Sequence, residues 1–308
     1  MTEPTNTAPL HRFSRKAMGT RFEIILACAD AGLARQLATD AFRELEGLER
    51  ELSRFIASSD VARINRLPAG GSVRIGAAAY DCLKIAARVC AETGGAFDPT
   101  VGALLAAWQH RDGSPHTPSD EELAEARQRS GMHLVEIHKG ENAVTVRAES
   151  VGLDLGGIGK GYALDTMAEL LAEWGVESAL LHGGESTVLG LGSGPENGWT
   201  VALRSPGTDD SALEELCLRG RALSGSGVEL HGRHIIDPRT GRSVERYRAA
   251  WALADGAARA DALSTAFMVM DQRKIESYCA AHEDCAAAVM RGADGESVLR
   301  RFGRWEGQ

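Results

Sequence analysis

Long apolar segments are absent from this chain of 308 residues. No stretch approaches the roughly 18 uncharged apolar residues of a transmembrane helix, which excludes a helical membrane span. The polar start, Met1–Leu10, lacks the basic segment and the apolar segment of a secretion signal. The sequence therefore indicates a cytoplasmic protein, unless a leader has been trimmed away.

The cysteine patterns of zinc sites and redox sites are missing as well. The six cysteines show neither CxxC spacing nor a histidine partner at zinc-ligand spacing; they stand at positions 28, 82, 90, 217, 279 and 285. We therefore expect reduced, partly buried thiols. Positive charge is also scarce, because 34 Lys and Arg face 43 Asp and Glu, for a net charge of −9. An acidic chain without a dense basic run is a poor binder of nucleic acid or anionic membranes.

The composition is otherwise that of a folded soluble protein. Hydrophobic residues make up 44% and charged residues 25%, which excludes intrinsic disorder. Alternating apolar residues predict a strand at Arg21–Cys28, with Phe22, Ile24 and Leu26 on one face. Further strands are expected at 133–138, 143–147, 178–181, 187–191, 199–203 and 249–254, and helices at 30–52, 77–93, 258–270 and 273–281. Another helix should start at Ser119, which stands at capping-box spacing from Glu122.

This mixed order of strands and helices predicts an α+β fold with a mixed or antiparallel sheet and packed helices. Residues 1–12 are typical of a flexible tail, and 13–308 of one compact domain. The sequence leaves room for a helical subdomain in the N-terminal half of that domain.

Four short motifs combine residues that could carry chemistry. The first, Asp154–Tyr162 (DLGGIGKGY), should lie between a strand that begins at Leu153 and a helix. Its four glycines let the backbone approach a ligand closely, and the helix start offers free N–H groups to phosphate. Lys160 could add a charge to a bound pyrophosphate. The segment fits neither the Rossmann nor the Walker pattern, and the alternative is a tight strand-to-helix turn.

The second motif, Asp261–Thr265 (DALST), should begin a helix. Asp261 and Thr265 share one face of that helix, with Ser264 beside them. A carboxylate and hydroxyls are hard oxygen ligands that suit Mg²⁺, which often also takes waters and substrate phosphate. The alternative is that Asp261 only caps the helix.

The third and fourth motifs are turns rich in Gly and Pro. In His234–Arg242 (HIIDPRTGR), His234 could act as a base near neutral pH or be a structural residue beside isoleucines. In Gly94–Gly102 (GGAFDPTVG), Phe97 could stack on a flat ring and Asp98 could accept a hydrogen bond from its edge. Alternatively, these two side chains pack in the core and cap the turn.

Together and in this order, the motifs resemble those of the FAD:protein FMN transferases, the ApbE family of flavin transferases. The resemblance runs from about residue 17 to about residue 272; its stretches are Met18–Thr20, Gly95–Gly102 followed by Trp108, Asp154–Asp165, Gly183–Gly184, His234–Arg242 and Ala260–Thr265. It implies an α+β fold related to the T-fold, so that 13–308 would be a flavin transferase domain. It also implies cleavage of FAD at its pyrophosphate and transfer of FMN, through a phosphoester, to a Ser or Thr of a target flavoprotein.

The resemblance also assigns site residues. It places a divalent ion at Asp261 and Thr265, with Ser264 nearby and the backbone carbonyl of Gly159. It implies FAD contacts at Met18, Phe55, Ala96, Phe97, Asp98, Gly156, Tyr162 and Ile236, to which Lys160 is added as a pyrophosphate ligand. His234 matches the family histidine proposed to activate the acceptor hydroxyl.

The sequence departs from the family pattern in three places. Gly159 replaces a common Ala, His182–Glu185 (HGGE) replaces a different polar segment, and the stretch from Ser224 to His234 is short. These differences affect the expected contacts with the acceptor protein more than the FAD site. Two other functions therefore stay open: an FAD pyrophosphatase that releases FMN and AMP to water, and a non-catalytic FAD-binding protein.

Overall fold

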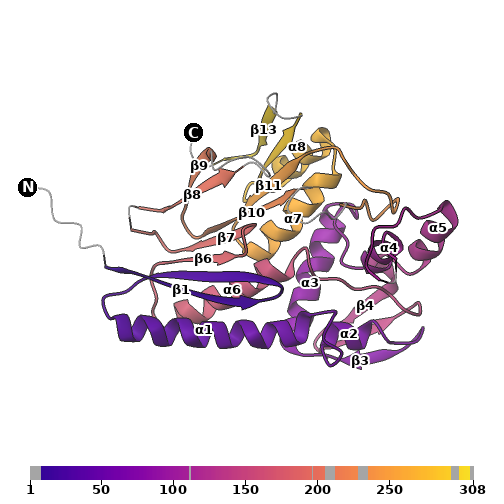
Figure 1. The fold of residues 1–308 in the computed structure, drawn as a ribbon, viewed down its shortest axis with the longest axis horizontal. Coiled ribbons are helices and arrows are strands. Elements are labelled where there is room, and N and C mark those ends of the chain that lie inside the picture. The colour runs from indigo at the N-terminus through magenta and orange to yellow at the C-terminus, as the bar shows by residue number, and fades with distance from the viewer. Residues whose placement is uncertain are drawn as a thin grey trace, which may run out of the picture.

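The fold is built on one large antiparallel sheet (Figure 1). The computed structural model describes residues 8–110, 112–195, 197–204, 212–227, 235–292 and 298–305. Eight strands follow one another from edge to edge: β1 (Leu10–Ala17), β2 (Thr20–Ala27), β6 (Ala179–Gly183), β7 (Thr187–Leu191), β10 (Arg221–Gly227), β11 (Ala249–Ala254), β12 (Ala286–Arg291) and β13 (Val298–Phe302). Every neighbouring pair in this order is antiparallel.

The first two strands form a hairpin with a two-residue turn. Ala17 pairs with Thr20, and the turn residues Met18 and Gly19 have φ angles of 50° and 72°. Two successive positive φ angles are the signature of a type I′ turn, whose twist matches that of the flanking strands. Because β1 begins at Leu10, residues 10–12 belong to this sheet, and their assignment to a flexible tail was wrong.

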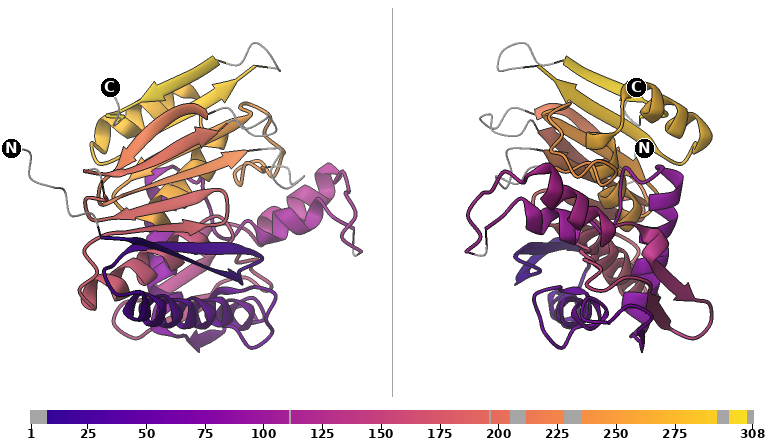
Figure 2. Two further views of the ribbon diagram at one scale, coloured as in Figure 1. Left: turned by 60° about the vertical axis from the view of Figure 1, so that its left-hand side comes forward. Right: turned by 90° about the vertical axis from the view of Figure 1, so that its right-hand side faces the viewer.

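Helices cover one face of the sheet (Figure 2). These are α1 (Ala31–Leu52), α6 (Gly159–Glu173), α7 (Ala257–Val269) and α8 (Gln272–Ala281). The strand β2 turns Phe22, Ile24 and Leu26 toward them, as its alternation predicted, and all three are fully buried in the main core. The α+β prediction is confirmed, and every strand pairing of the large sheet is antiparallel. No helix within the described ranges is both long and apolar enough to cross a membrane.

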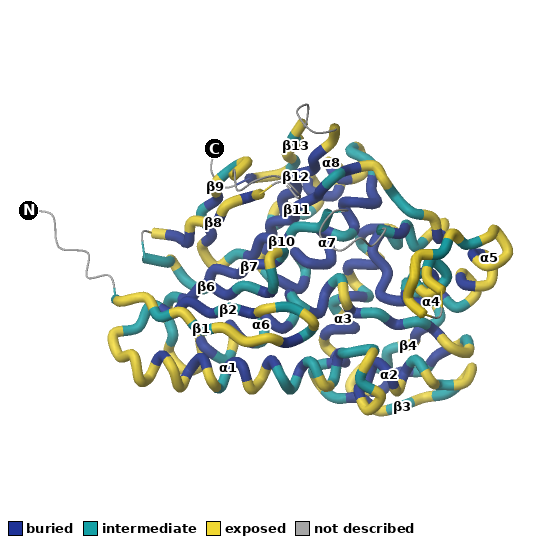
Figure 3. Tube along the Cα trace, viewed as in Figure 1, coloured by how far each residue is buried: buried dark blue, intermediate teal, exposed yellow. Residues whose placement is uncertain are grey.

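The opposite face of the sheet carries a second, smaller sheet. Its strands β8 (Trp199–Arg204) and β9 (Ala212–Leu218) pair with each other and bury Trp199, Val201 and Leu216 against the large sheet. The strand β11 is therefore covered on both faces, and all six of its residues are buried. Figure 3 shows this continuous buried layer through the middle of the molecule.

The segment between β2 and β6 adds a mixed region beside the sheet. Besides α1 and α6, it contains α2 (Asp60–Ile64), α3 (Ala77–Glu92), α4 (Gly102–Ala107), α5 (Asp120–Gln128), and a small sheet of β3 (Ser72–Arg74), β5 (Ala143–Val146) and β4 (Val135–His138). The predicted capping box of Ser119 and Glu122 begins α5. The strands β4 and β5 lie where strands were expected at 133–138 and 143–147, so this region is not purely helical. Many of its apolar side chains share the main core with those of α1, α6 and α7, whereas Leu104 and Ala126 belong to a separate small cluster.

One predicted strand is absent. The residues from Leu153 to Leu155 belong to no strand, although their sequence alternates. The Asn65 side chain exchanges two hydrogen bonds with the backbone of Leu153, and the Asp154 N–H donates to the carbonyl of Pro99. A side chain and a loop carbonyl thus take the place of a partner strand, which alternation alone does not indicate.

Candidate active site

A large cavity opens where the β1–β2 turn, the end of α1 and the start of α6 meet. Its volume is about 1110 Å³, slightly more than the roughly 300–1,000 Å³ typical of small-molecule sites, so it has room for a large ligand. Among the residues predicted for the site, five line it: Met18, Phe55, Gly156, Gly159 and Lys160. Further lining residues include Glu49, Arg54, Asp154, His182 and Ser186.

The glycine motif forms the cavity floor. Asp154 accepts a hydrogen bond from the Gly156 N–H at 2.8 Å and forms an ion pair with Arg54, whose Nε lies 3.2 Å away. The helix α6 begins at Gly159, and Gly159 and Lys160 line the cavity. The N–H groups of Gly159 and Gly161 already donate to the Leu155 carbonyl and to Asp261, so the positive group that this floor offers an anion is the Lys160 ammonium.

Asp261 faces this floor from the neighbouring helix α7. Its side chain is 3% exposed, and its two carboxylate oxygens lie 3.2 and 3.3 Å from Nζ of Lys160. One of these oxygens also accepts the N–H of Gly161 at 3.2 Å. Because α7 begins at Ala257 and Gly256 is its N-cap, Asp261 lies inside the helix. The alternative that Asp261 merely caps the helix is therefore wrong.

Hydroxyl groups lie on two sides of Asp261: those of Ser264 and Thr265 donate to its backbone carbonyl at 2.9 and 3.5 Å, and others lie near its carboxylate. Ser226 on β10 contacts Ser264 at 2.8 Å and Thr265 at 3.3 Å. On the other side, Thr187 and Ser224 contact each other at 2.9 Å, and each lies 3.4 Å from Asp261 Oδ1. The predicted metal ligands Asp261, Ser264 and Thr265 are thus brought together, and two strands extend the cluster.

The donor set of this cluster fits a hard divalent cation. A buried carboxylate and several hydroxyl oxygens are ligands that suit Mg²⁺, which is usually completed by water and phosphate oxygens. The described residues hold no group of three or more His, Cys, Asp or Glu side chains around one point, so a closed all-protein metal cage is not found among them. In the structure, the ammonium of Lys160 is the positive group beside Asp261.

Gly157 is the point at which three motifs meet. A side-chain carbon added at Gly157 would lie 3.3 Å from both the ring of Phe97 and Oγ1 of Thr265. The GAFDPTVG turn and helix α7 therefore pack on the glycine floor from below. Phe97 is 4% exposed, Ala96 is also buried, and neither lines the cavity.

The remaining predicted FAD contacts also lie away from the cavity lining. Asp98 is engaged in its own turn, where it accepts hydrogen bonds from the backbone and hydroxyl of Thr100 and from the Met132 N–H. Ile236 is buried in a small cluster with Leu104 of α4. Tyr162 packs toward α3, and burial raises the pKa of its phenol. These assignments remain predictions from the resemblance.

The HIIDPRTGR turn is tied to the GAFDPTVG region. The methylene groups of Arg239 lie over Gly95, and the indole N–H of Trp108 donates to the carbonyl of Gly241 at 2.9 Å. Asp237 holds Arg239 through two hydrogen bonds of 2.8 Å. The proposed base, His234, lies outside the described residues, so its role stays a prediction.

The cavity wall formed by the β1–β2 turn and the segment after α1 is open. Phe55 is 77% exposed, and the guanidinium of Arg54 lies 4.7 Å from the centre of its ring. The N–H of Met18 donates to Glu49 at 2.6 Å, which holds the β1–β2 turn against α1. An exposed aromatic ring beside a cavity offers a flat surface on which a planar ring can stack.

Several site residues escaped the sequence analysis. The hydroxyls of Thr187, Ser224 and Ser226 come from strands far from α7 in sequence, and no local motif marks them. Arg54 offered a weak signal, because it directly precedes Phe55. His182 in the cavity wall was noted only as a departure; burial lowers the pKa of its imidazole, so this side chain is neutral near pH 7.

Comparisons with known proteins identify the family and the fold. The model of the ApbE family matches residues 18–290. The FAD:protein FMN transferase of Klebsiella pneumoniae is 28% identical over 307 residues, which cover 95% of this chain and 87% of that protein. The ApbE protein of Thermotoga maritima superposes with a TM-score of 0.85 at 27% identity, over 96% of this chain and 97% of that one.

The flavinyl transferase ApbE of Pseudomonas stutzeri superposes with a TM-score of 0.83 at 26% identity, over 96% of each chain. The resemblance and the fold inferred from the sequence are thus confirmed. Since the family model spans nearly the whole sequence, including the glycine floor and the Asp261 cluster, this chain belongs to the ApbE family.

Proposed function

We propose that this protein transfers FMN from FAD to a Ser or Thr of a target flavoprotein and releases AMP. The observation that carries the proposal is the buried Asp261, which stands among hydroxyl groups beside a cavity of about 1110 Å³. Relatives that align with nearly the whole chain are named FAD:protein FMN transferases, a name that supports the transfer of FMN to a protein.

In the proposed complex, the open wall binds the flavin and the glycine floor binds the pyrophosphate. Phe55 offers its exposed ring for stacking, and Gly156, Gly159 and Lys160 of the floor would face the phosphates. Asp261, Ser264, Thr265 and the Gly159 carbonyl would hold Mg²⁺, which supplies charge neutralisation on pyrophosphate oxygens.

The chain's own residues then position the reaction. Lys160, which already lies beside Asp261, is close enough to the floor to pair with a phosphate oxygen. The acceptor hydroxyl oxygen attacks the phosphorus of the FMN half, the bond to the AMP phosphate breaks, and AMP leaves. We propose His234 as the group that takes the hydroxyl proton, a role typically worth about 10²–10⁴-fold in rate.

The test is incubation of the purified protein with FAD, MgCl₂ and candidate acceptor proteins from the same genome. Intact mass spectrometry should show one added FMN on an acceptor, and an acceptor whose target Ser or Thr is replaced by Ala should stay unmodified. The same reaction with EDTA is the metal control. AMP release without any acceptor modification would instead establish the pyrophosphatase, and FAD binding without AMP release would establish a binding protein.

A further inference from the structure

We infer that Asp165 is a positioning residue for the Asp261 cluster: its carboxylate fixes the first turn of α7 on α6. The inference rests on the proposed function, because it concerns the helix that carries the proposed metal ligands. Asp165 itself does not line the cavity, and no role was assigned to it above.

The geometry is that of a helix cap supplied by a neighbouring helix. Oδ1 of Asp165 accepts the N–H of Ala257 at 2.6 Å, and Oδ2 accepts the N–H of Ala258 at 2.8 Å. These are the first two residues of α7, and the N-cap residue, Gly256, has no side chain to satisfy them. The start of a helix leaves such N–H groups without partners, so Asp165 supplies what the local sequence lacks.

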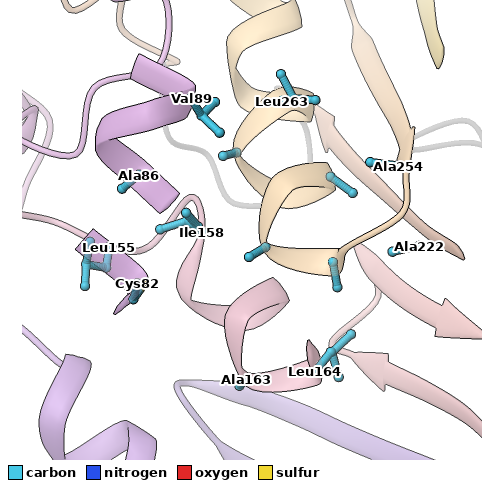
Figure 4. Packing of buried hydrophobic residues seen from close by; sticks show 14 of the residues in the cluster. Cys82, Ala86, Val89, Leu155, Ile158, Ala163, Leu164, Ala222, Ala254 and Leu263 are labelled. Carbon is cyan, nitrogen blue, oxygen red and sulfur yellow. The ribbon is translucent and has the colours of Figure 1, made fainter. Parts of the chain in front are cut away.

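A close backbone contact holds the same junction. A side-chain carbon added at Gly161 would lie 2.0 Å from the carbonyl oxygen of Ala257, so only glycine permits this approach of α6 to α7. One turn further along α7, Asp261 accepts the N–H of the same Gly161. Figure 4 shows buried side chains of both helices, Leu164 and Leu263 among them, packed around this region.

An ionised carboxylate at this buried position costs folding free energy. Burial raises the pKa of Asp165 to about 6, although its two backbone hydrogen bonds act in the opposite direction, and Glu169 and Asp261 add like charge. Cys82 of α3 also lies within electrostatic reach. A neutral side chain with a single acceptor would cap without this cost. The arrangement is explained if both oxygens are needed to set the position of α7.

The test measures Mg²⁺ binding directly, by calorimetric titration of the full-length protein with MgCl₂. Asp165→Asn keeps the size of the side chain but replaces one acceptor oxygen by an NH₂ group. We expect the Mg²⁺ dissociation constant to rise by about 10–100-fold, the usual effect of losing a group that orients metal ligands. FAD affinity measured without Mg²⁺ should change less than twofold.

The matched control is Asp30→Ala. Asp30 caps α1 by accepting the N–H groups of Gly32 and Leu33, and α1 carries none of the proposed metal ligands. This variant should melt at a lower temperature yet bind Mg²⁺ as the wild type does. An equal loss of Mg²⁺ affinity in Asp30→Ala would show that general destabilisation explains both results and would overturn the inference.

A second variant covers the case in which Asp165→Asn does not fold. Ala257→Pro removes one of the two donors while it leaves the carboxylate in place, and proline is well tolerated at the first residue of a helix. Gly256 before it already has the extended backbone, φ −127° and ψ 144°, that a following proline requires. The Ala257→Pro variant should also weaken Mg²⁺ binding.

The outcomes separate the two proposals. A folded Asp165→Asn or Ala257→Pro variant with wild-type Mg²⁺ affinity would overturn the inference about Asp165. A wild-type protein that binds no Mg²⁺ would instead contradict the proposed function.

Discussion

The Asp261 cluster behind the cavity floor and the cavity wall around Phe55 differ in how far the chain completes them by itself. The closed side, which we define as Lys160, Asp261, Ser264 and Thr265, reaches the cavity through Lys160, and its polar groups are hydrogen-bonded to one another. Two of the four residues, Asp261 and Ser264, are buried. On the open side, defined as Met18, Arg54 and Phe55, a large aromatic ring faces solvent. Under the proposed function, the reaction centre would be organised before substrate arrives, whereas the substrate itself would complete the binding wall.

The largest expected effect is on stability, from removal of the Phe97 ring that packs behind the closed side. Phe97→Ala removes a buried ring that packs against the glycine floor next to Thr265, and we expect it to lower the free energy of unfolding by about 3–5 kcal/mol. Urea unfolding of the purified variant measures this. Unchanged stability together with weaker FAD binding would instead make Phe97 a ligand contact.

Asp261→Asn tests the closed side itself. The amide keeps an acceptor for the Gly161 N–H, so the melting temperature should change little, but the negative charge is lost. We expect AMP release from FAD to fall by about 10²–10³-fold, the magnitude typical of losing one electrostatic group at a reaction centre. A variant that retains full activity at saturating Mg²⁺ would remove Asp261 from the proposed metal site.

The pH dependence of stability reports on the buried carboxylate behind the closed side. Burial raises the folded-state pKa of Asp165 from 3.8 to about 6, so the folded protein binds this proton more tightly than the unfolded chain. Stability from this group is present below about pH 4 and is lost as the pH rises through 6, by up to roughly 3 kcal/mol.

Asp165→Asn removes that titration. Relative to the wild type, its free energy of unfolding should therefore improve between pH 4.5 and pH 7. Urea midpoints of both proteins at the two pH values measure the difference, and parallel pH profiles would show that Asp165 has an ordinary pKa.

Phe55→Ala tests the open side. Because this ring is 77% exposed, its removal should leave the melting temperature unchanged. FAD binding should weaken by about 1–3 kcal/mol if the flavin stacks on the ring, by analogy with bases on aromatic side chains. Fluorescence titration with FAD measures the affinity, with Phe55→Tyr as the variant that keeps a stacking surface.

The smallest effects compare two glycines that are two residues apart. Gly161→Ala forces a carbon to within 2.0 Å of the Ala257 carbonyl, so we expect a loss of about 1–3 kcal/mol in stability. Gly159→Ala meets no atom within 4 Å and should be neutral or stabilise by up to about 1 kcal/mol. Thermal melts of the two variants test whether tight packing begins at Gly161 and not at Gly159. Equal destabilisation of the two variants would show that both glycines are tightly packed.

Local signals were enough to predict most helices of the fold. The apolar spacing of α1, with Asp30 as its cap, and the capping box of α5 act within a few residues, so the sequence alone reveals them. Strands of unusual composition were missed for a physical reason. The strand β12 reads AAAVMR and β10 reads RALSGSG, and small residues become strands here because both faces are covered by other layers.

The sequence predicted individual residues of the candidate site but not which distant residues lie beside them. The motif around Asp261 identified a carboxylate and two hydroxyls, since these lie one helical turn apart. The hydroxyls of Ser224 and Ser226 join them only because β10 lies against α7, a contact that depends on the order of strands in the sheet. The conformation of Leu153 depends in the same way on a distant side chain, that of Asn65.

The strand order of the large sheet also bears on how the protein is made. Along the sheet, the strands succeed one another in the order of synthesis, from β1 to β13, so each can add to an edge that already exists. The pairing of β2 with β6 is expected to be slow. It can form only after α1 and the whole mixed region, which lie between the two strands in the sequence, have been translated. The open side is thus encoded early and Asp261 late. A nascent chain acquires the wall proposed to bind the flavin long before it acquires Asp261, and incomplete chains that stop before α7 would lack Asp261 altogether.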